Sequence, residues 1–112
     1  MTQIEYSMKD LYLRADGHSR HGPVGGDIVC AGVSVLTHAL LNTLMEEEEK
    51  KEMQLDWTMM PGHIEIRAKP ANKGSRRRAR DYFTVTVTGL KAMAQDYELN
   101  VEIKEVQDSG NV

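Results

Sequence analysis

A single cysteine stands where a glycine-rich segment gives way to a long apolar one. Cys30 is the only cysteine of the 112-residue chain, and it follows Asp27 by three positions. Asp27 is a good N-cap because its carboxylate can accept hydrogen bonds from the free backbone N–H groups of the next turn. A helix that begins at Ile28 places Cys30 in its first turn, where the helix dipole favours thiolate over thiol. This pattern predicts a nucleophilic cysteine.

A nucleophilic thiol needs a base, and two histidines precede it in the glycine-rich segment. His18 follows Gly17 at the start of a loop, residues 17–27, that contains four glycines. The freedom of this loop allows His18 to fold over Cys30 and take its proton. His21 is a second candidate, but His18 is favoured because the strand before it fixes its position better. A mobile loop over a nucleophile can also act as a gate.

The same stretch carries a family pattern. Residues 17–34 contain Gly17-His18, then Asp27-Ile28-Val29-Cys30-Ala31-Gly32, then Ser34. This order resembles the ribosomal-processing cysteine protease family, Prp, which has Gly-His ahead of the cysteine, an aspartate three positions before it and a serine four positions after it. The chain departs from the family at Ser19-Arg20-His21, where relatives often carry a small residue and an aromatic one.

The resemblance implies a cysteine endopeptidase in which Cys30 attacks a peptide carbonyl and His18 is the general base. The substrate would be the N-terminal extension of a large-subunit ribosomal protein, ending in aromatic residues, or a phage capsid or scaffold protein with a similar N-terminus. Backbone N–H groups at the helix start would hold the oxyanion, and the enzyme would be a homodimer without cofactor or metal. Asp27 is interpreted as a cap rather than as a partner of His18. Supporting or substrate-binding roles are assigned to Gly17, His21, Gly22, Asp27 and Ser34.

Two binding functions fit parts of the same residues. A glycine-rich loop before a helix N-terminus can hold phosphate or nucleotide, although neither the GxGxxG spacing nor a Gly-Lys-Ser/Thr ending is present. A zinc site from His18, His21 and Cys30 lacks the second cysteine of the usual patterns. His38 and His63 have no spacing that recruits them, and both are interpreted as ordinary surface or partly buried histidines.

Composition narrows the class of protein. The length favours one domain, expected at residues 1–106 with a loose tail at 107–112, and 40% hydrophobic content indicates a globular chain. We expect no membrane span, because no apolar run approaches about 20 residues, and no signal peptide. A lone free thiol fits the reducing cytoplasm. The net charge of −3 argues against direct nucleic-acid binding, so the basic run at 76–80 is interpreted as solvated helix surface, although RNA contact is the alternative.

Hydrophobic periodicity predicts an α+β fold, a two-layer sandwich of a mostly antiparallel sheet with two helices on one face, in the order β-β-α-β-β-α. Residues 84–88 have strand propensity, but Phe83, Val87 and Leu90 keep helical spacing, so we expect a helix there, as the family order also implies. The expected strands are 3–8, 11–15, 53–60 and 62–69, the helices are 28–45 and 76–97, and residues 101–106 suggest a short closing strand.

Three further expectations concern packing. The helix at 28–45 is apolar nearly all round, so one side should face its own sheet and another a second subunit. The charge run at 46–51 is interpreted as a solvated helix end and linker. Trp57 is expected in the core or at an interface.

Overall fold

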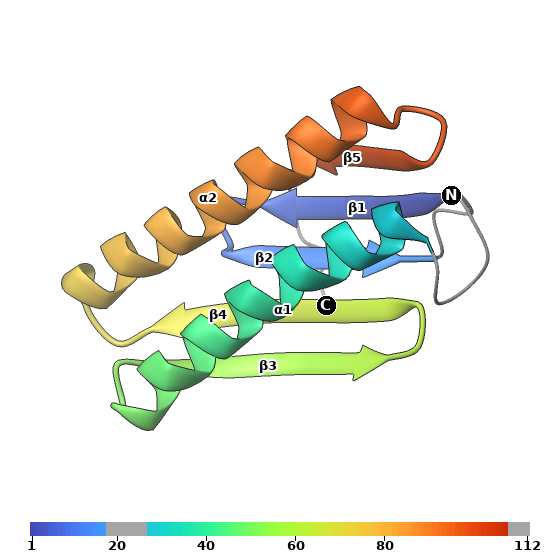
Figure 1. Cartoon of the computed structure of the whole chain (residues 1–112). Coiled ribbons are helices and arrows are strands. Elements are labelled where there is room, and N and C mark those ends of the chain that lie inside the picture. Colours follow the sequence, from blue (N-terminus) through green and yellow to red (C-terminus); the bar gives the residue numbers. More distant parts are fainter. Residues whose placement is uncertain (18–26, 108–112) are drawn as a thin grey trace.

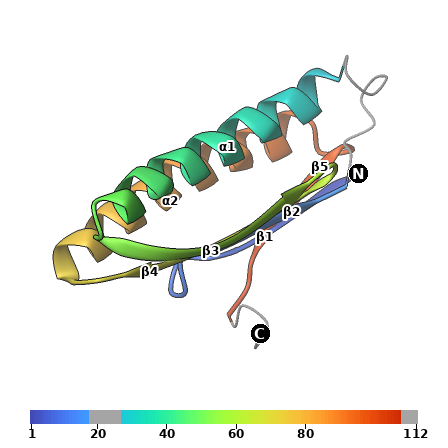
Figure 2. The ribbon, with the colours of Figure 1, turned by 90° about the horizontal axis from the view of Figure 1, so that it is seen from below.

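The protein is described here by a computed structural model that covers residues 1–17 and 27–107. Five strands form one sheet in the order β3-β4-β2-β1-β5, and two helices lie on one face of it (Figure 1). Figure 2 shows both helices on the same side of the sheet. The elements are β1 (Thr2–Ser7), β2 (Tyr12–Asp16), α1 (Ile28–Glu49), β3 (Met53–Met60), β4 (His63–Pro70), α2 (Lys73–Asp96) and β5 (Val101–Glu105).

The predicted fold class is confirmed. All strand pairs are antiparallel except β1 with β5, which is the predicted closing strand. Apolar residues alternate along each central strand because successive side chains point to opposite faces. Ile4 pairs with Ala15 and Tyr6 with Leu13 across β1 and β2, and all four are buried. Together with Ile66 on β4, these four residues form the apolar face of the sheet against which the helices pack.

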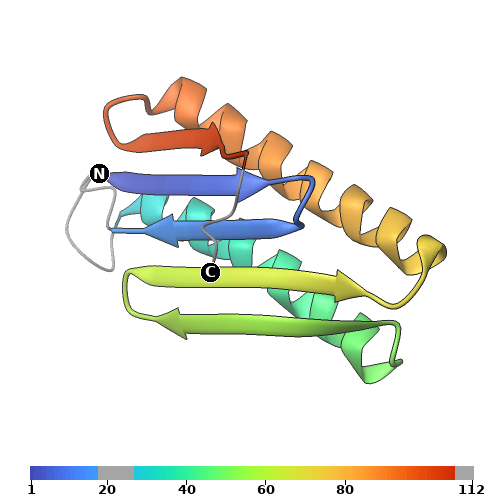
Figure 3. The ribbon, with the colours of Figure 1, turned by 180° about the vertical axis from the view of Figure 1, so that it is seen from behind.

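The other face of the sheet carries no helix (Figure 3) and is charged. Arg14 on β2 donates to Glu5 on β1 at 2.7 Å. The Tyr12 hydroxyl donates to the Glu65 carboxylate at 2.7 Å, and the Arg67 guanidinium lies 4.7 Å from the centre of the Tyr12 ring. Burial and the hydrogen bond to Glu65 raise the pKa of Tyr12 to about 12. Pairing of this kind allows the uncovered face to contact water.

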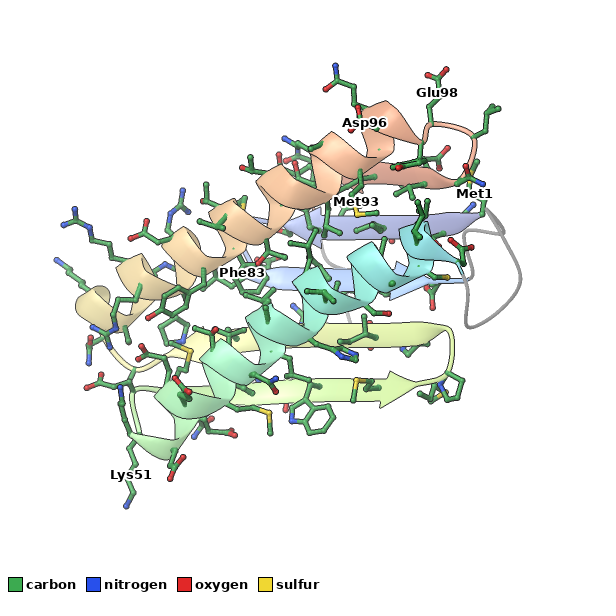
Figure 4. The ribbon with its side chains drawn as sticks, viewed as in Figure 1. Met1, Lys51, Phe83, Met93, Asp96 and Glu98 are labelled. Atoms are coloured by element: carbon green, nitrogen blue, oxygen red, sulfur yellow. The ribbon has the colours of Figure 1, made fainter. Side chains whose placement is uncertain are left out.

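Helix α2 confirms that packing overrides propensity in the segment that was ambiguous from sequence. It begins with a capping box in which the Asn72 side chain accepts from the Ser75 backbone N–H and the Ser75 hydroxyl accepts from the Asn72 backbone N–H. Phe83, Val87 and Leu90 are buried, as the helical spacing required. Figure 4 shows Phe83 on the side of α2 that faces α1.

The expectations for the two charge runs and for Trp57 hold only in part. Helix α1 continues to Glu49, and within the charge run the side chain of Glu47 is buried because Arg78 and Tyr82 of α2 bind it. The basic run is therefore not uniformly solvated either. Trp57 is exposed on β3 and does not lie in the core, which leaves only the expectation of an interface.

Of two expectations about the whole chain, the absence of a long apolar segment is wrong and the domain boundary is not tested. By length and composition alone, α1 is apolar enough to cross a membrane, contrary to the expectation that no such segment exists. Core helices of soluble proteins meet the same criterion, and the Val33, Leu40 and Leu44 side of α1 is buried within the fold. The domain boundary at 106 is not tested, because most of the predicted tail, residues 108–112, lies outside the described residues.

Candidate active site

The first turn of α1 is organised by Asp27, as predicted. The Asp27 carboxylate accepts from the backbone N–H groups of Val29 at 2.9 Å and Cys30 at 3.1 Å, and the Asp27 carbonyl accepts from Ala31 at 3.0 Å. Asp27 is itself buried. Helix α1 begins at Ile28, so Cys30 is its third residue. The cap therefore places the thiol in the turn where the helix dipole is most positive.

The same bonds bear on the expected oxyanion site. The N–H groups of Val29, Cys30 and Ala31 all donate to Asp27, and an oxyanion site among the backbone N–H groups of the helix start stays a prediction. A carboxylate at this point also repels an added anion and takes the donors that phosphate would need. The geometry thus argues against a phosphate or nucleotide site at this helix start.

Cys30 and Ser34 lie on a face of α1 that reaches solvent. Cys30 is half-buried and Ser34 is exposed, whereas Val29 and Val33 are buried in the core. Gly32 leaves room for the Met93 side chain of α2 behind this turn, because a Cβ at Gly32 would come within 2.7 Å of the Met93 Cε atom. Figure 4 shows Met93 at this end of the helical pair. The helix is therefore anchored on one side and presents the thiol on the other.

Gly17 has a structural reason to be glycine. Its φ angle is +92°, a region that side chains rarely adopt. A Cβ there would lie 2.6 Å from the carbonyl oxygen of Met1, and the Gly17 N–H donates to the Gly62 carbonyl at 2.7 Å. In Figure 1 the end of β2 and the start of α1 lie at the same end of the molecule. Gly17 thus acts through its backbone, at the point where the chain leaves the sheet.

Several predicted site residues fall outside the described part of the chain. His18, His21 and Gly22 belong to the segment 18–26, so their predicted roles are not tested. Within residues 1–17 and 27–107, no group of three or more His, Cys, Asp and Glu side chains could hold a metal ion. The zinc alternative needs two of the residues outside those ranges.

Sequence reasoning missed one pair at this end of the sheet. His63 was interpreted as an ordinary histidine, but its Nδ1 atom contacts the Asp16 carboxylate. Asp16 immediately precedes Gly17-His18 in the sequence. The only available signal was that Asp16 and His63 each stand at the end of a predicted strand, and pairing them required the order of strands in the sheet.

The whole-chain pattern matches a family model described as "Cysteine protease Prp" over residues 1–102. The chain belongs to this family. It is 26% identical, over 88 residues that span 79% of each chain, to the ribosomal processing cysteine protease Prp of two Staphylococcus aureus strains. This confirms the resemblance stated from the sequence and identifies the protein as a cysteine protease.

Solved structures share the fold. The crystal structure of Prp from S. aureus with a covalently linked product peptide has a TM-score of 0.79 at 23% identity, covering 95% of this chain and 100% of that one. The same protease with a substrate peptide has a TM-score of 0.72 at 21% identity, with the same coverage. At these identities the likeness supports the arrangement of helices and strands.

Proposed function

We propose that this protease removes an N-terminal extension from a large-subunit ribosomal protein, with Cys30 as nucleophile and His18 as general base. The observation that carries the proposal is the position of Cys30, on the solvent-reaching face of the first turn of α1, under a buried aspartate cap. A structural cysteine would be expected on the buried side, with Val29 and Val33. The described residues contain no other thiol.

The chemistry is acyl transfer to the cysteine. His18 takes the proton of the Cys30 thiol, and the thiolate attacks the substrate carbonyl to form a tetrahedral intermediate. The protonated His18 then gives its proton to the leaving amine, and water hydrolyses the acyl-enzyme. Asp27 supports this by holding the helix start in place. Ser34, one turn along on the exposed side, is proposed to contact the substrate or the loop, together with His21 and Gly22.

The relatives support the substrate class. The S. aureus relatives are named for ribosomal processing, and structures of that protease contain a substrate or product peptide. We carry this over as a protein substrate with an N-terminal extension that ends in aromatic residues, cut in the cytoplasm. A phage capsid or scaffold protein with a similar N-terminus is the other substrate that this chemistry would accept.

A homodimer is the proposed assembly. Several large apolar side chains of α1 point away from the core of the subunit: Ile28, Val35 and Met45. On β3, the edge strand nearest α1, Trp57 and Met59 are exposed as well. Apolar surface on neighbouring elements is typical of protein contacts. A second copy that covers the outer side of α1 would explain why this helix is apolar nearly all round.

The test compares single variants on candidate peptides. Peptides that span the N-terminal extension of the ribosomal protein, and phage peptides of similar sequence, are incubated with enzyme and analysed by mass spectrometry. Cys30→Ala should abolish cleavage and leave the fold intact, since a half-buried first-turn side chain contributes little packing. His18→Ala should lose most activity. His38→Ala is the matched control, because His38 is exposed in the middle of α1.

The outcomes separate the parts of the proposal. Equal cleavage by wild type and Cys30→Ala would remove Cys30 as the nucleophile. Loss of activity in His21→Ala with retention in His18→Ala would reassign the base. Cleavage of the phage peptides alone would change the substrate. A monomer by analytical ultracentrifugation, at concentrations where the enzyme is active, would refute the dimer.

A further inference from the structure

Asp16 and His63 form a side-chain pair on the helix-free face of the sheet. They lie where β2 ends, directly before the Gly17-His18 pair of the family pattern. Asp16 is the last residue of β2 and His63 the first of β4, and the antiparallel register places them opposite each other. The His63 Nδ1 atom lies within hydrogen-bonding distance of Asp16 Oδ1. The Arg14 Nε atom forms an ion pair with Asp16 Oδ2 at 3.1 Å. One carboxylate therefore ties together two strands and an arginine.

The backbone beside this pair is fixed at the same point. The Gly17 N–H donates to the carbonyl of Gly62. This backbone hydrogen bond joins the residues that directly neighbour Asp16 and His63, so the ends of β2 and β4 are connected by both backbone and side chains. Gly17 also lies directly against the Met1 carbonyl. The next residue in the chain is His18. The position of the strand end thus sets where the segment carrying His18 begins.

We propose that Asp16 and His63 are positioning residues for peptide-bond cleavage, which hold the end of β2 against β4 and so fix the point from which His18 is presented to Cys30. This rests on the proposed role of His18 as general base. Ends of strands open more easily than their centres, and a displacement of about 1 Å in a catalytic group can cost roughly 100-fold in rate. The contact between the Asp16 and His63 side chains holds the end of β2 in place and so limits displacement of the point where residue 18 follows.

The pair is less exposed than the Lys69–Asp56 ion pair of this face. Lys69 and Asp56 also pair across strands, at 3.0 Å, but their side chains are 57% and 69% exposed. The His63 and Asp16 side chains are 26% and 40% exposed. Exposed pairs contribute little because solvent screens them. Asp56 lies on β3, away from the strand end that precedes His18, and so provides a matched control.

The experiment measures cleavage kinetics and thiol reactivity in the full-length enzyme. For His63→Ala we expect kcat to fall roughly 10- to 100-fold, with little change in KM, whereas Asp56→Ala should behave as wild type. His63→Asn, whose amide can donate from near the Nδ1 position, should recover most of the loss. Asp16→Asn, which keeps the shape of the carboxylate, is the second variant if His63→Ala fails to fold.

Alkylation of Cys30 by iodoacetamide separates positioning from general damage. In the presence of His18, His63→Ala should slow alkylation at neutral pH. In a His18→Ala background the same change should have no further effect, because the Asp16–His63 contact acts through His18. An equal slowing in both backgrounds, or His63→Ala and Asp16→Asn kinetics that match Asp56→Ala, would overturn the positioning role. Failure of the proposed function itself would be visible separately, as full activity of the His18→Ala or Cys30→Ala single variant.

Discussion

The two ends of the helical layer are held together by opposite kinds of contact. At the end that carries Cys30, the contacts between the helices are apolar: a Cβ at Gly32 would come within 2.7 Å of the Met93 Cε atom, and a Cβ at Gly89 within 3.1 Å of the Leu36 methyl groups. At the other end, near Lys51 in Figure 4, a buried carboxylate joins them. Glu47 of α1 is only 6% exposed and is bound by side chains of α2.

The carboxylate at the far end is well satisfied. Arg78 donates to it through Nε at 3.1 Å and through Nη2 at 3.0 Å, and the Tyr82 hydroxyl donates at 2.9 Å. The Arg78 guanidinium also lies 3.5 Å from the Glu52 carboxylate. The hydrogen bonds to this buried carboxylate are directional, so they fix the relative position of the two helices more narrowly than apolar contacts do.

The difference indicates that the contacts that stabilise the helix pair at the Glu47 end are separate from the residues proposed to carry out the reaction at the Cys30 end. At the Cys30 end the contacts between the helices are apolar, and the backbone N–H groups of the first turn of α1 donate to Asp27. The polar network at the far end makes no contribution to the site, yet it sets how α1 lies across the sheet. Changes at the two ends should therefore affect different measurements.

The largest effect is expected at the Cys30 end, in Gly17→Ala. Alanine at a φ of +92° is strained by about 1–2 kcal/mol, and its Cβ would meet the Met1 carbonyl, a backbone atom that cannot turn away. We expect a lower free energy of unfolding in urea and a large loss of cleavage, because residue 18 follows directly. Gly89→Ala is the matched control: its neighbour is the flexible end of Leu36, and alanine gains about 1 kcal/mol of helix propensity. Equal stability of the two variants would refute the special role of Gly17.

Most of the fold follows from the sequence because its signals are local. Alternating residues on the strands and the 3.6-residue spacing of Phe83, Val87 and Leu90 depend on neighbours in the chain, and the N-cap at Asp27 acts within one turn. The family pattern around Cys30 is likewise a short run. These features predicted the order of elements and the placement of the thiol at a helix start.

The contacts between distant elements could not be read in this way. Glu47 and Arg78 looked like solvated members of charge runs, since burial of either depends on how α1 and α2 cross. Predicting the Asp16–His63 pair would have required knowing that β2 and β4 are neighbours in the sheet. The engagement of the Cys30 N–H by Asp27, in contrast, followed from the predicted cap itself.

A smaller effect, on stability rather than catalysis, is expected from Arg78→Ala at the far end. The change leaves the buried Glu47 carboxylate with fewer donors, which costs more than the loss of an exposed charge. Arg77→Ala is the control, because Arg77 is an exposed neighbour in the same basic run. We expect a lower melting temperature for Arg78→Ala only, with kcat and KM for peptide cleavage unchanged well below it. A loss of kcat without a loss of stability would contradict the separation of the two ends.

The smallest expected effect is a pH dependence of that stability difference. Hydrogen bonds from Arg78, the largest cause, and from Tyr82 lower the pKa of Glu47 below its ordinary value of 4.5, although burial opposes them. A lowered pKa in the folded state stabilises the fold above the ordinary value, and this contribution is lost as the pH falls through the lowered one. Urea unfolding at a fixed protein concentration should therefore show a gap between wild type and Arg78→Ala that is full at pH 7 and shrinks below pH 4.5. A gap that stays constant on acidification would mean that the ionised form of Glu47 does not hold the two helices together.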